Sequence, residues 1–119
     1  MRLLICGGRD FNDRKLFRQT MEQKQGVKLI IHGGAKGADT MADIWAKAHG
    51  IPVVRMDALW DAHGKRAGCL RNQAMLDLLH PDGVLAFPGG NGTADMVRRA
   101  EKAGLPVQVI DKNYWGDEL

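Results

Sequence analysis

The sequence is poor in cysteine and in long apolar runs. Only 2 of its 119 residues are cysteines, and Cys6 and Cys69 form no CxxC pair. This excludes a disulfide-stapled scaffold and the cysteine spacing of a zinc site. No apolar run approaches the roughly 20 residues of a membrane span, and the apolar start is too short for a signal peptide. We therefore expect a cytoplasmic protein with no membrane partner.

Aromatic residues and excess charge are scarce as well. Aromatic residues make up 6% of the chain, and 17 Lys and Arg against 14 Asp and Glu leave a net charge of +3. This balance argues against a nucleic-acid partner but permits a small anionic ligand. The 4 histidines lack the spacing of a metal site or a catalytic triad. The sequence therefore indicates no metal and no required cofactor.

The length predicts a single domain spanning residues 1–119. Hydrophobic residues make up 45% of the chain and charged residues 26%. These shares are typical of a globular protein that folds by itself and do not fit a mainly disordered or fibrous chain.

Glycine is the residue present in excess. The chain has 15 glycines in 119 residues, nearly twice the usual share of about 7%. Eight of them follow short apolar runs directly and suit loops that lead from a strand to a helix. Four others precede such runs, and we expect them to end helices because glycine adopts the left-handed conformation without strain. These four are Gly26, Gly50, Gly83 and Gly104.

Five short apolar runs predict buried β-strands, and segments of helical period separate them. Continuous apolar, β-branched runs favour a parallel sheet covered on both faces, joined by right-handed crossovers. We expect a three-layer, doubly wound, Rossmann-like α/β domain with a mainly parallel five-stranded sheet in the order 3-2-1-4-5. The strands are expected at residues 3–6, 28–32, 53–56, 84–87 and 107–110.

Four apolar stripes at helical spacing predict the faces that cover the sheet. Asn12 or Asp13 is expected to cap the first helix, and Asp39 suits the first turn of the second. Arg71 precedes the third stripe by one turn and is expected to point inward. The stripes are Leu16, Phe17, Thr20 and Met21; Ala38, Met41, Ala42, Trp45 and Ala46; Ala74, Met75, Leu78 and Leu79; and Thr93, Met96, Val97 and Ala100.

The glycine-rich loops fall where a ligand is expected. In an open α/β sheet, ligands bind beyond the carboxyl ends of the strands, where the strand order reverses. Glycines there let a phosphate approach N–H groups at a helix N-terminus, although tight turns alone would leave the same pattern. Neither GxxxxGK[ST] nor GxGxxG is present. The predicted phosphate-binding residues of the loops are Gly7, Gly8, Arg9, Asp10, Gly33, Gly34, Ala35, Lys36, Gly37, Asp39, Pro88, Gly89, Gly90, Asn91, Gly92 and Thr93.

Arg71 is the side chain expected to meet the phosphate, with Asn72 beside it offering an amide to a base or ribose. A structural ion pair of Arg71 with Asp10 or Asp57 is the alternative.

Trp60 and Lys65 lie in a glycine-bounded loop before Arg71. This loop is predicted to close over the ligand, with Trp60 as a flat stacking surface. Simple packing of Trp60 in the core fits the sequence equally well.

As an ordered set, these motifs resemble the YspA-like branch of the SLOG superfamily. The resemblance covers nearly the whole chain and implies a Rossmann-like fold with a nucleotide or nucleotide-derived ligand such as ADP-ribose. The superfamily includes the LOG phosphoribohydrolases and the DNA-processing protein DprA. Because its members often dimerise, the resemblance also implies a homodimer. The motifs are GGRDF at 7–11, GGAKGAD at 33–39, Trp60, GK at 64–65, AG at 67–68, RN at 71–72, Met75 and PGGNGT at 88–93.

The chain departs from the hydrolases of this superfamily at their catalytic positions. Those enzymes carry PGGxGTxxE with a catalytic glutamate, and the matching residue here is Met96. Asp95 lies one residue earlier, about 100° around the helix. Arg71 matches the arginine of the family's RK motif, but Asn72 replaces its lysine. The resemblance thus implies that phosphate binding is retained and the usual acid–base group is lost.

We therefore expect a nucleotide-binding module, acting as a sensor, with no assigned catalytic residue. A nucleotide hydrolase of the phosphoribohydrolase type is the alternative, with Asp10, Asp39 and Asp95 as candidate carboxylates. A weaker alternative is DNA binding in the manner of DprA, based on an outward cluster on the fourth helix. That cluster comprises Arg98, Arg99 and Lys102.

Overall fold

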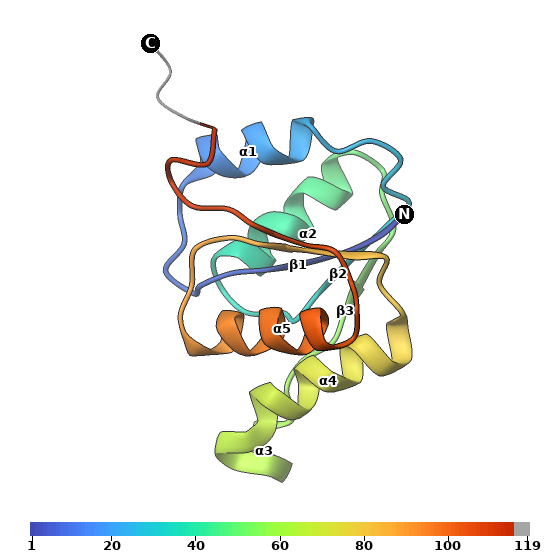
Figure 1. Ribbon diagram of the computed structural model, residues 1–119, viewed down its shortest axis with the longest axis vertical. Helices are drawn as coiled ribbons and strands as arrows, with labels where there is room; N and C mark the ends of the chain where they lie inside the picture. Colours follow the sequence, from blue (N-terminus) through green and yellow to red (C-terminus); the bar gives the residue numbers. More distant parts are fainter. Residues whose placement is uncertain (116–119) are drawn as a thin grey trace.

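The strands lie side by side in a fully parallel sheet, seen in the computed structural model of Figure 1, which describes residues 1–115. Within this part of the chain the sheet has five strands in the order β3-β2-β1-β4-β5. The predicted strand order is therefore confirmed, and every predicted strand end lies within one residue of the observed end. The strands are β1 (Arg2–Cys6), β2 (Leu29–His32), β3 (Val53–Arg55), β4 (Gly83–Ala86) and β5 (Val107–Val109).

The helices cover the sheet on both faces (Figure 1). On one face, α1 (Arg14–Glu22) and α2 (Ala38–Ala48) enclose an apolar core. On the other, α4 (Ala67–Leu79) and α5 (Asn91–Lys102) enclose a second one. This is the predicted three-layer, doubly wound arrangement. The apolar runs of β1, β2 and β4 read as continuous because both faces of these strands are buried.

The segment before α4 was predicted as a loop and is in fact helical. It forms the short helix α3 (Trp60–His63) and the 3-10 turn η1 (Gly64–Arg66). A four-residue helix is too short to show an apolar period, which is why the sequence pattern missed it.

The predicted face of α4 is only partly right. Leu78 was placed inward, yet 67% of it is exposed. Met75 is buried as predicted, and Asn72 and Leu76, which lie outside the predicted stripe, are buried as well. Apolar residues occur on all sides of α4, and the helix packs against α5 as well as the sheet, so the apolar stripe alone does not define the buried face.

The helix ends follow the expected chemistry with two exceptions, at Gly26 and Gly83. Gly26 does not end α1: the C-cap of that helix is Gln23, and Gly26, with φ of 69°, lies in the loop beyond it. Asp13 Oδ1 accepts the N–H of Leu16 at 3.0 Å and caps α1, as predicted. Gly50 and Gly104 follow α2 and α5 with φ of 66° and 79°. Gly83 does not end a helix: it begins β4, and the left-handed residue after α4 is His80, with φ of 47°. No helix within residues 1–115 has the length and apolar character needed to cross a membrane.

Candidate functional site

The loops that leave β1, β2 and β4 meet at the carboxyl edge of the sheet. The N–H of Gly8 donates to the carbonyl of Pro88 at 2.8 Å, which joins the loops after β1 and β4. The N–H of Ala38 donates to the carbonyl of Gly8 at 3.4 Å, which joins the start of α2 to the same point. The glycine-rich loops therefore surround the position where the strand order reverses.

A cavity of about 480 Å³ lies between these loops and the N-terminal ends of α4 and α5. We call it the switch-point cavity. It brings together thirteen of the predicted site residues: Gly7, Gly8, Arg9, Gly33, Ala35, Asp39, Trp60, Arg71, Asn72, Gly90, Asn91, Gly92 and Thr93.

The other predicted residues lie outside this cavity. Asp10, Gly34 and Lys36 line an adjoining cavity of about 520 Å³, which also contacts Arg9, Trp60 and Arg71. Pro88 and Gly89 line a third cavity, on the α1 side of the loops. Gly37 lines none of the three, and the side chain of Lys65 lies outside the part of the chain that the structure describes.

The glycines of the loops fall into two groups. A Cβ on Gly7 would lie 2.6 Å from the Cβ of Ala38. Gly37 has φ of 77°, and a Cβ on it would clash with the backbone of the loop after β1. These glycines are needed for the close packing of the loops themselves. A Cβ on Gly90 or Gly92 would meet nothing within 4 Å. Packing therefore does not explain why these two positions lack a side chain.

The first turn of α5 is open toward the switch-point cavity. Gly90 is the N-cap residue, and no side chain caps this end of the helix. The N–H groups of the first turn and the positive end of the helix dipole are therefore available to an anion.

Arg71 forms a wall of the same cavity and is held by neutral acceptors. Its Nη1 donates to the carbonyl oxygen of Gly33 at 2.7 Å and to that of Met56 at 3.4 Å. Its Nε donates to Oδ1 of Asn72 at 3.1 Å. The half-buried guanidinium is thus fixed in place while its charge is not neutralised by any of these partners.

The ion pairs considered for Arg71 are not formed. Within residues 1–115, no carboxylate lies within salt-bridge distance of Arg71. Asp57 instead accepts from Nε of Arg55 at 2.9 Å, and Asp10 is exposed.

Asn72 is buried, and its side-chain amide forms hydrogen bonds with other groups of the protein. Its Nδ2 donates to the carbonyl of Gly92 at 3.2 Å and to Oδ2 of Asp95 at 3.0 Å, while its Oδ1 accepts from Arg71. The expected role of Asn72 in offering an amide to a base or ribose has no support here, because both ends of the amide already have partners. Its observed role is to tie α4 to the first turn of α5.

Asp39 is the one carboxylate among the described residues that line the switch-point cavity. Only 5% of Asp39 is exposed, and its Oδ2 accepts the N–H groups of Gly33 at 3.0 Å and Ala35 at 3.2 Å. Burial raises the pKa of Asp39, and these hydrogen bonds with the charges of His32 and Arg71 oppose the rise only in part.

Asp95 lies away from the cavity. Oδ2 of Asp95 accepts from Nε of Arg99 at 2.8 Å, and Oδ1 accepts from Arg98 at 3.2 Å. Burial would raise the pKa of Asp95, but hydrogen bonds from Arg99 and Asn72 and the two guanidinium charges hold it below its usual value. The pairing also partly neutralises the basic cluster on α5. Met96, at the position of the superfamily's glutamate, is 1% exposed and packs in the core.

Trp60 stands at the rim of the cavity and is 50% exposed, so it is not a core residue. The guanidinium carbon of Arg9 lies 5.8 Å from the centroid of its ring. The rim thus presents a flat aromatic face with a cation beside it.

Five residues of the cavity wall were not among the predicted site residues: Ile5, Cys6, Gly68, Cys69 and Met75. Gly68 and Met75 had appeared only as motifs of the family resemblance. Their positions at the end of β1 and on α4 are the signal that would have found them. Burial, together with the charge of Asp39, raises the pKa of Cys6 to about 12 against an opposing effect of Arg71, so its thiol stays protonated. Within residues 1–115, no group of three or more His, Cys, Asp or Glu side chains is arranged to hold a metal ion.

Comparison with known proteins identifies the family. Residues 1–63 match the sequence model of the YspA, cpYpsA-related SLOG family. The chain belongs to this family. The Gene 61 protein of Mycobacterium phage D29 is 41% identical over 120 residues, which cover 89% of this chain and 93% of that protein. The resemblance seen in the sequence motifs is therefore confirmed, and membership of the SLOG family indicates a nucleotide-related role.

Proposed function

We propose that this SLOG protein binds a nucleotide or a nucleotide-derived molecule in the switch-point cavity and releases it unchanged, as a sensor would. The phosphate lies between the first turn of α5 and the guanidinium of Arg71. The observation that carries the proposal is the state of Arg71: its charge lacks a carboxylate partner within residues 1–115, and three neutral oxygens hold it in the cavity wall. An arginine held in this way suits a phosphate oxygen.

Two further observations support the proposal. Gly90 and Gly92 leave open space beside the N–H groups of α5, which allows a phosphate to approach the main chain. Trp60 offers an exposed ring at the rim, where a nucleotide base can stack.

Hydrolysis of the bound nucleotide is the second candidate function, and Asp39 is the observation that favours it. This buried carboxylate lines the cavity, and its pKa is raised by burial, as expected for a general acid. One observation argues against hydrolysis. The N–H groups of Gly33 and Ala35 both donate to Oδ2 of Asp39, which is typical of a carboxylate that orders a loop.

The test is calorimetric titration with AMP, ADP and ATP, followed by chromatography of each mixture. We expect binding with the nucleotide recovered intact, and an Arg71→Gln variant that binds at least about tenfold more weakly, because hydrogen bonds to a charged group contribute about 1.5–3 kcal/mol. The matched control is Arg98→Gln, whose side chain is 70% exposed on α5. Equal affinities for the two variants would refute the phosphate position, and product formation would favour hydrolysis.

A further inference from the structure

His32, the last residue of β2, is a buried polar side chain that the proposed nucleotide site does not use. Only 1% of it is exposed, and it lines none of the three cavities around the loops. Both of its ring nitrogens nevertheless have partners. Nε2 lies 2.9 Å from Oδ1 of Asp43 on α2, and Nδ1 accepts the N–H of Gly34 at 3.0 Å. The ring therefore connects α2 to the loop after β2.

The two partners fix the position of the hydrogen on the ring. A backbone N–H can only donate, so Nδ1 carries no hydrogen. Asp43 is an acceptor, because hydrogen bonds from Lys47 and from His32 lower the pKa of its carboxyl group and keep it ionised. Nε2 therefore carries the hydrogen. The hydrogen bond with Gly34 exists only while His32 is uncharged, because a protonated imidazole has an N–H at both nitrogens.

One peptide group joins His32 to Arg71. The N–H of Gly34 and the carbonyl of Gly33 belong to the same planar unit and point in opposite directions. Nδ1 of His32 accepts the N–H, and Nη1 of Arg71 donates to the carbonyl oxygen at 2.7 Å. Any rotation of this peptide group changes both contacts at once. Glycine on either side of the peptide group favours such a rotation, because glycine has the widest range of backbone conformations.

Protonation of His32 would reverse the preferred orientation of this peptide group. The new N–H at Nδ1 and the N–H of Gly34 would be two donors facing each other, and a buried donor without an acceptor is costly. If the peptide group turns over, the carbonyl of Gly33 accepts from Nδ1 instead. That carbonyl then no longer holds Nη1 of Arg71, and the guanidinium loses the shortest of its hydrogen bonds in the cavity wall.

We propose that His32 is a positioning residue that makes ligand binding in the switch-point cavity depend on pH. The neutral ring orients the peptide group between Gly33 and Gly34 so that Arg71 is fixed for binding, and the protonated ring releases Arg71. The inference rests on the proposed function and adds its regulation. Because the neutral form binds the ligand more tightly, the affinity falls as the pH falls, and ligand binding displaces the proton.

Carboxylates and cations are mixed around His32. On β1, the residues on the same face of the sheet are the apolar Leu3 and Ile5. Carboxylates favour the protonated ring and cations oppose it, so no large excess of one sign fixes its charge. Among the side chains that the structure describes, the charged groups near the ring and the peptide group are Asp39, Asp43 and Lys47 on α2, Arg55 and Asp57 at β3, and Arg71 on α4.

The test is calorimetric titration with ADP at pH 7.5 and pH 5.5, on either side of the usual histidine pKa of about 6.5. The informative variant is His32→Asn, because Oδ1 of Asn can accept the N–H of Gly34 and the side chain takes up no proton. This variant should bind ADP at pH 7.5 within about threefold of the unmodified protein. On going to pH 5.5, the unmodified protein should lose at least about tenfold more affinity than the variant. Protonation of ADP itself affects both proteins equally.

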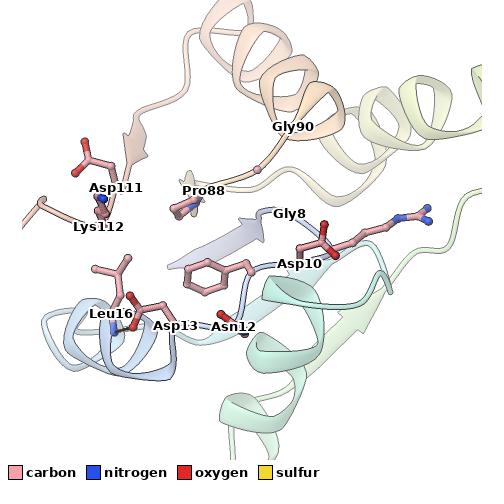
Figure 2. A pocket seen from close by; sticks show the side chains of 12 residues that line it. Gly8, Asp10, Asn12, Asp13, Leu16, Pro88, Gly90, Asp111 and Lys112 are labelled. Carbon is pink, nitrogen blue, oxygen red and sulfur yellow. Dashed lines mark hydrogen bonds between the residues drawn. The ribbon is translucent and has the colours of Figure 1, made fainter.

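Two further variants complete the comparison. His32→Leu has no acceptor for the N–H of Gly34 and should bind ADP weakly at both pH values. The matched control is His80→Asn, which should keep the pH response of the unmodified protein. His80 is exposed at the end of α4, and its φ of 47° also suits Asn. It lines neither the switch-point cavity nor the cavity on the α1 side of the loops, which Figure 2 shows.

The outcomes separate this inference from the proposed function. An equal pH response of the unmodified protein and His32→Asn would overturn the inference and leave the proposed function standing. Absence of ADP binding by the unmodified protein at pH 7.5 would overturn both.

Nitrogen NMR spectroscopy of the histidine rings tests the inference in the unmodified protein, without any variant that has to fold. We expect His32 to carry its hydrogen on Nε2 alone at pH 7.5. At pH 5.5, saturating ADP should increase the neutral fraction of the ring, because the coupling between proton and ligand is reciprocal. A hydrogen on Nδ1 at pH 7.5, or a ring charge that ADP leaves unchanged at pH 5.5, would overturn the inference.

Discussion

At the scale of single residues, the loops contain glycines that the fold needs and glycines that the fold does not need but the proposed ligand would use. Gly7 packs where a Cβ would touch Ala38, so its role is accounted for without any ligand. Gly92 faces open space in the first turn of α5 and has no such role. Glycine thus has a packing role at Gly7, whereas at Gly92 its role belongs to the proposed ligand binding.

This difference predicts that Gly7→Ala mainly lowers stability, whereas Gly92→Ala mainly weakens ligand binding. Gly7→Ala should lower the free energy of unfolding by about 1–3 kcal/mol, because a Cβ that is 2.6 Å from Ala38 forces the loop to shift. Gly92→Ala should change it by less than about 1 kcal/mol while weakening ADP binding severalfold. Urea denaturation and calorimetric titration measure both effects. Full ADP affinity in Gly92→Ala would argue against a phosphate close to this part of the main chain.

Asp39 predicts a pH dependence of stability with a defined sign. Because burial raises its pKa in the folded state, the ionised form is disfavoured there, and the stability of the protein decreases as the pH rises through that pKa. Asn at this position can still accept the N–H groups of Gly33 and Ala35 and carries no charge. Asp39→Asn should therefore unfold at a higher urea concentration than the unmodified protein at pH 7.

The advantage of Asp39→Asn should shrink as the pH falls toward the usual pKa of about 3.9 for an aspartate. A constant difference between the two proteins from pH 7 to pH 4 would contradict the assignment. If the protein hydrolyses its ligand, this variant should also lose that activity while remaining folded.

At the scale of elements, Asn72 connects α4 to α5 and positions Arg71. It bonds Gly92 and Asp95 on α5 and accepts from Arg71 on its own helix. The residue that departs from the superfamily's RK motif therefore serves to hold the site together. The sequence predicted Asn72 as part of the site, and it does line the cavity, but the partners of its amide group lie on α5.

Replacing Asn72 is expected to affect both stability and binding. Asn72→Ala should lower the free energy of unfolding by about 1–3 kcal/mol, because the buried Asp95 and the carbonyl of Gly92 each lose a donor. Nucleotide affinity should fall as well, since Arg71 loses one of its acceptors. Asp77→Ala, at an exposed position of the same helix, is the control and should stay within about 0.5 kcal/mol. A variant as stable as this control would show that the α4–α5 link contributes little.

At the scale of the whole molecule, the proposed ligand site is made by segments that meet only in the folded state. The loops after β1, β2 and β4 and the starts of α4 and α5 all contribute to one cavity. A ligand that binds there binds the folded chain and not the unfolded one, so binding and folding are coupled.

This coupling predicts a single thermal transition that shifts upward with ligand. At a free ADP concentration one hundred times its dissociation constant, the free energy of unfolding should rise by about 2.7 kcal/mol. In Arg71→Gln the same ADP concentration should produce a much smaller shift. Differential scanning calorimetry measures both. A shift of equal size in the two proteins would show that ADP does not bind beside Arg71.

The sequence by itself determined the layers, the strand order and the edge where the loops gather. This was possible because strands buried on both faces give continuous apolar runs, and because a chain of alternating strands and helices has few right-handed parallel arrangements. The glycine loops and Arg71 could be predicted as a candidate site for the same reason. Once the strands are assigned, the residues at the carboxyl edge of the sheet are known, and this is where ligands bind in such folds.

Only the tertiary structure decided which face of α4 is buried, which partner Asn72 takes and which glycines have open space. Leu78 is exposed and Asn72 bonds Gly92 and Asp95 because α4 and α5 pack against each other as well as against the sheet. Contacts between elements distant in sequence depend on how each helix is rotated. Apolar spacing constrains that rotation only loosely when, as in α4, apolar side chains lie all around the helix.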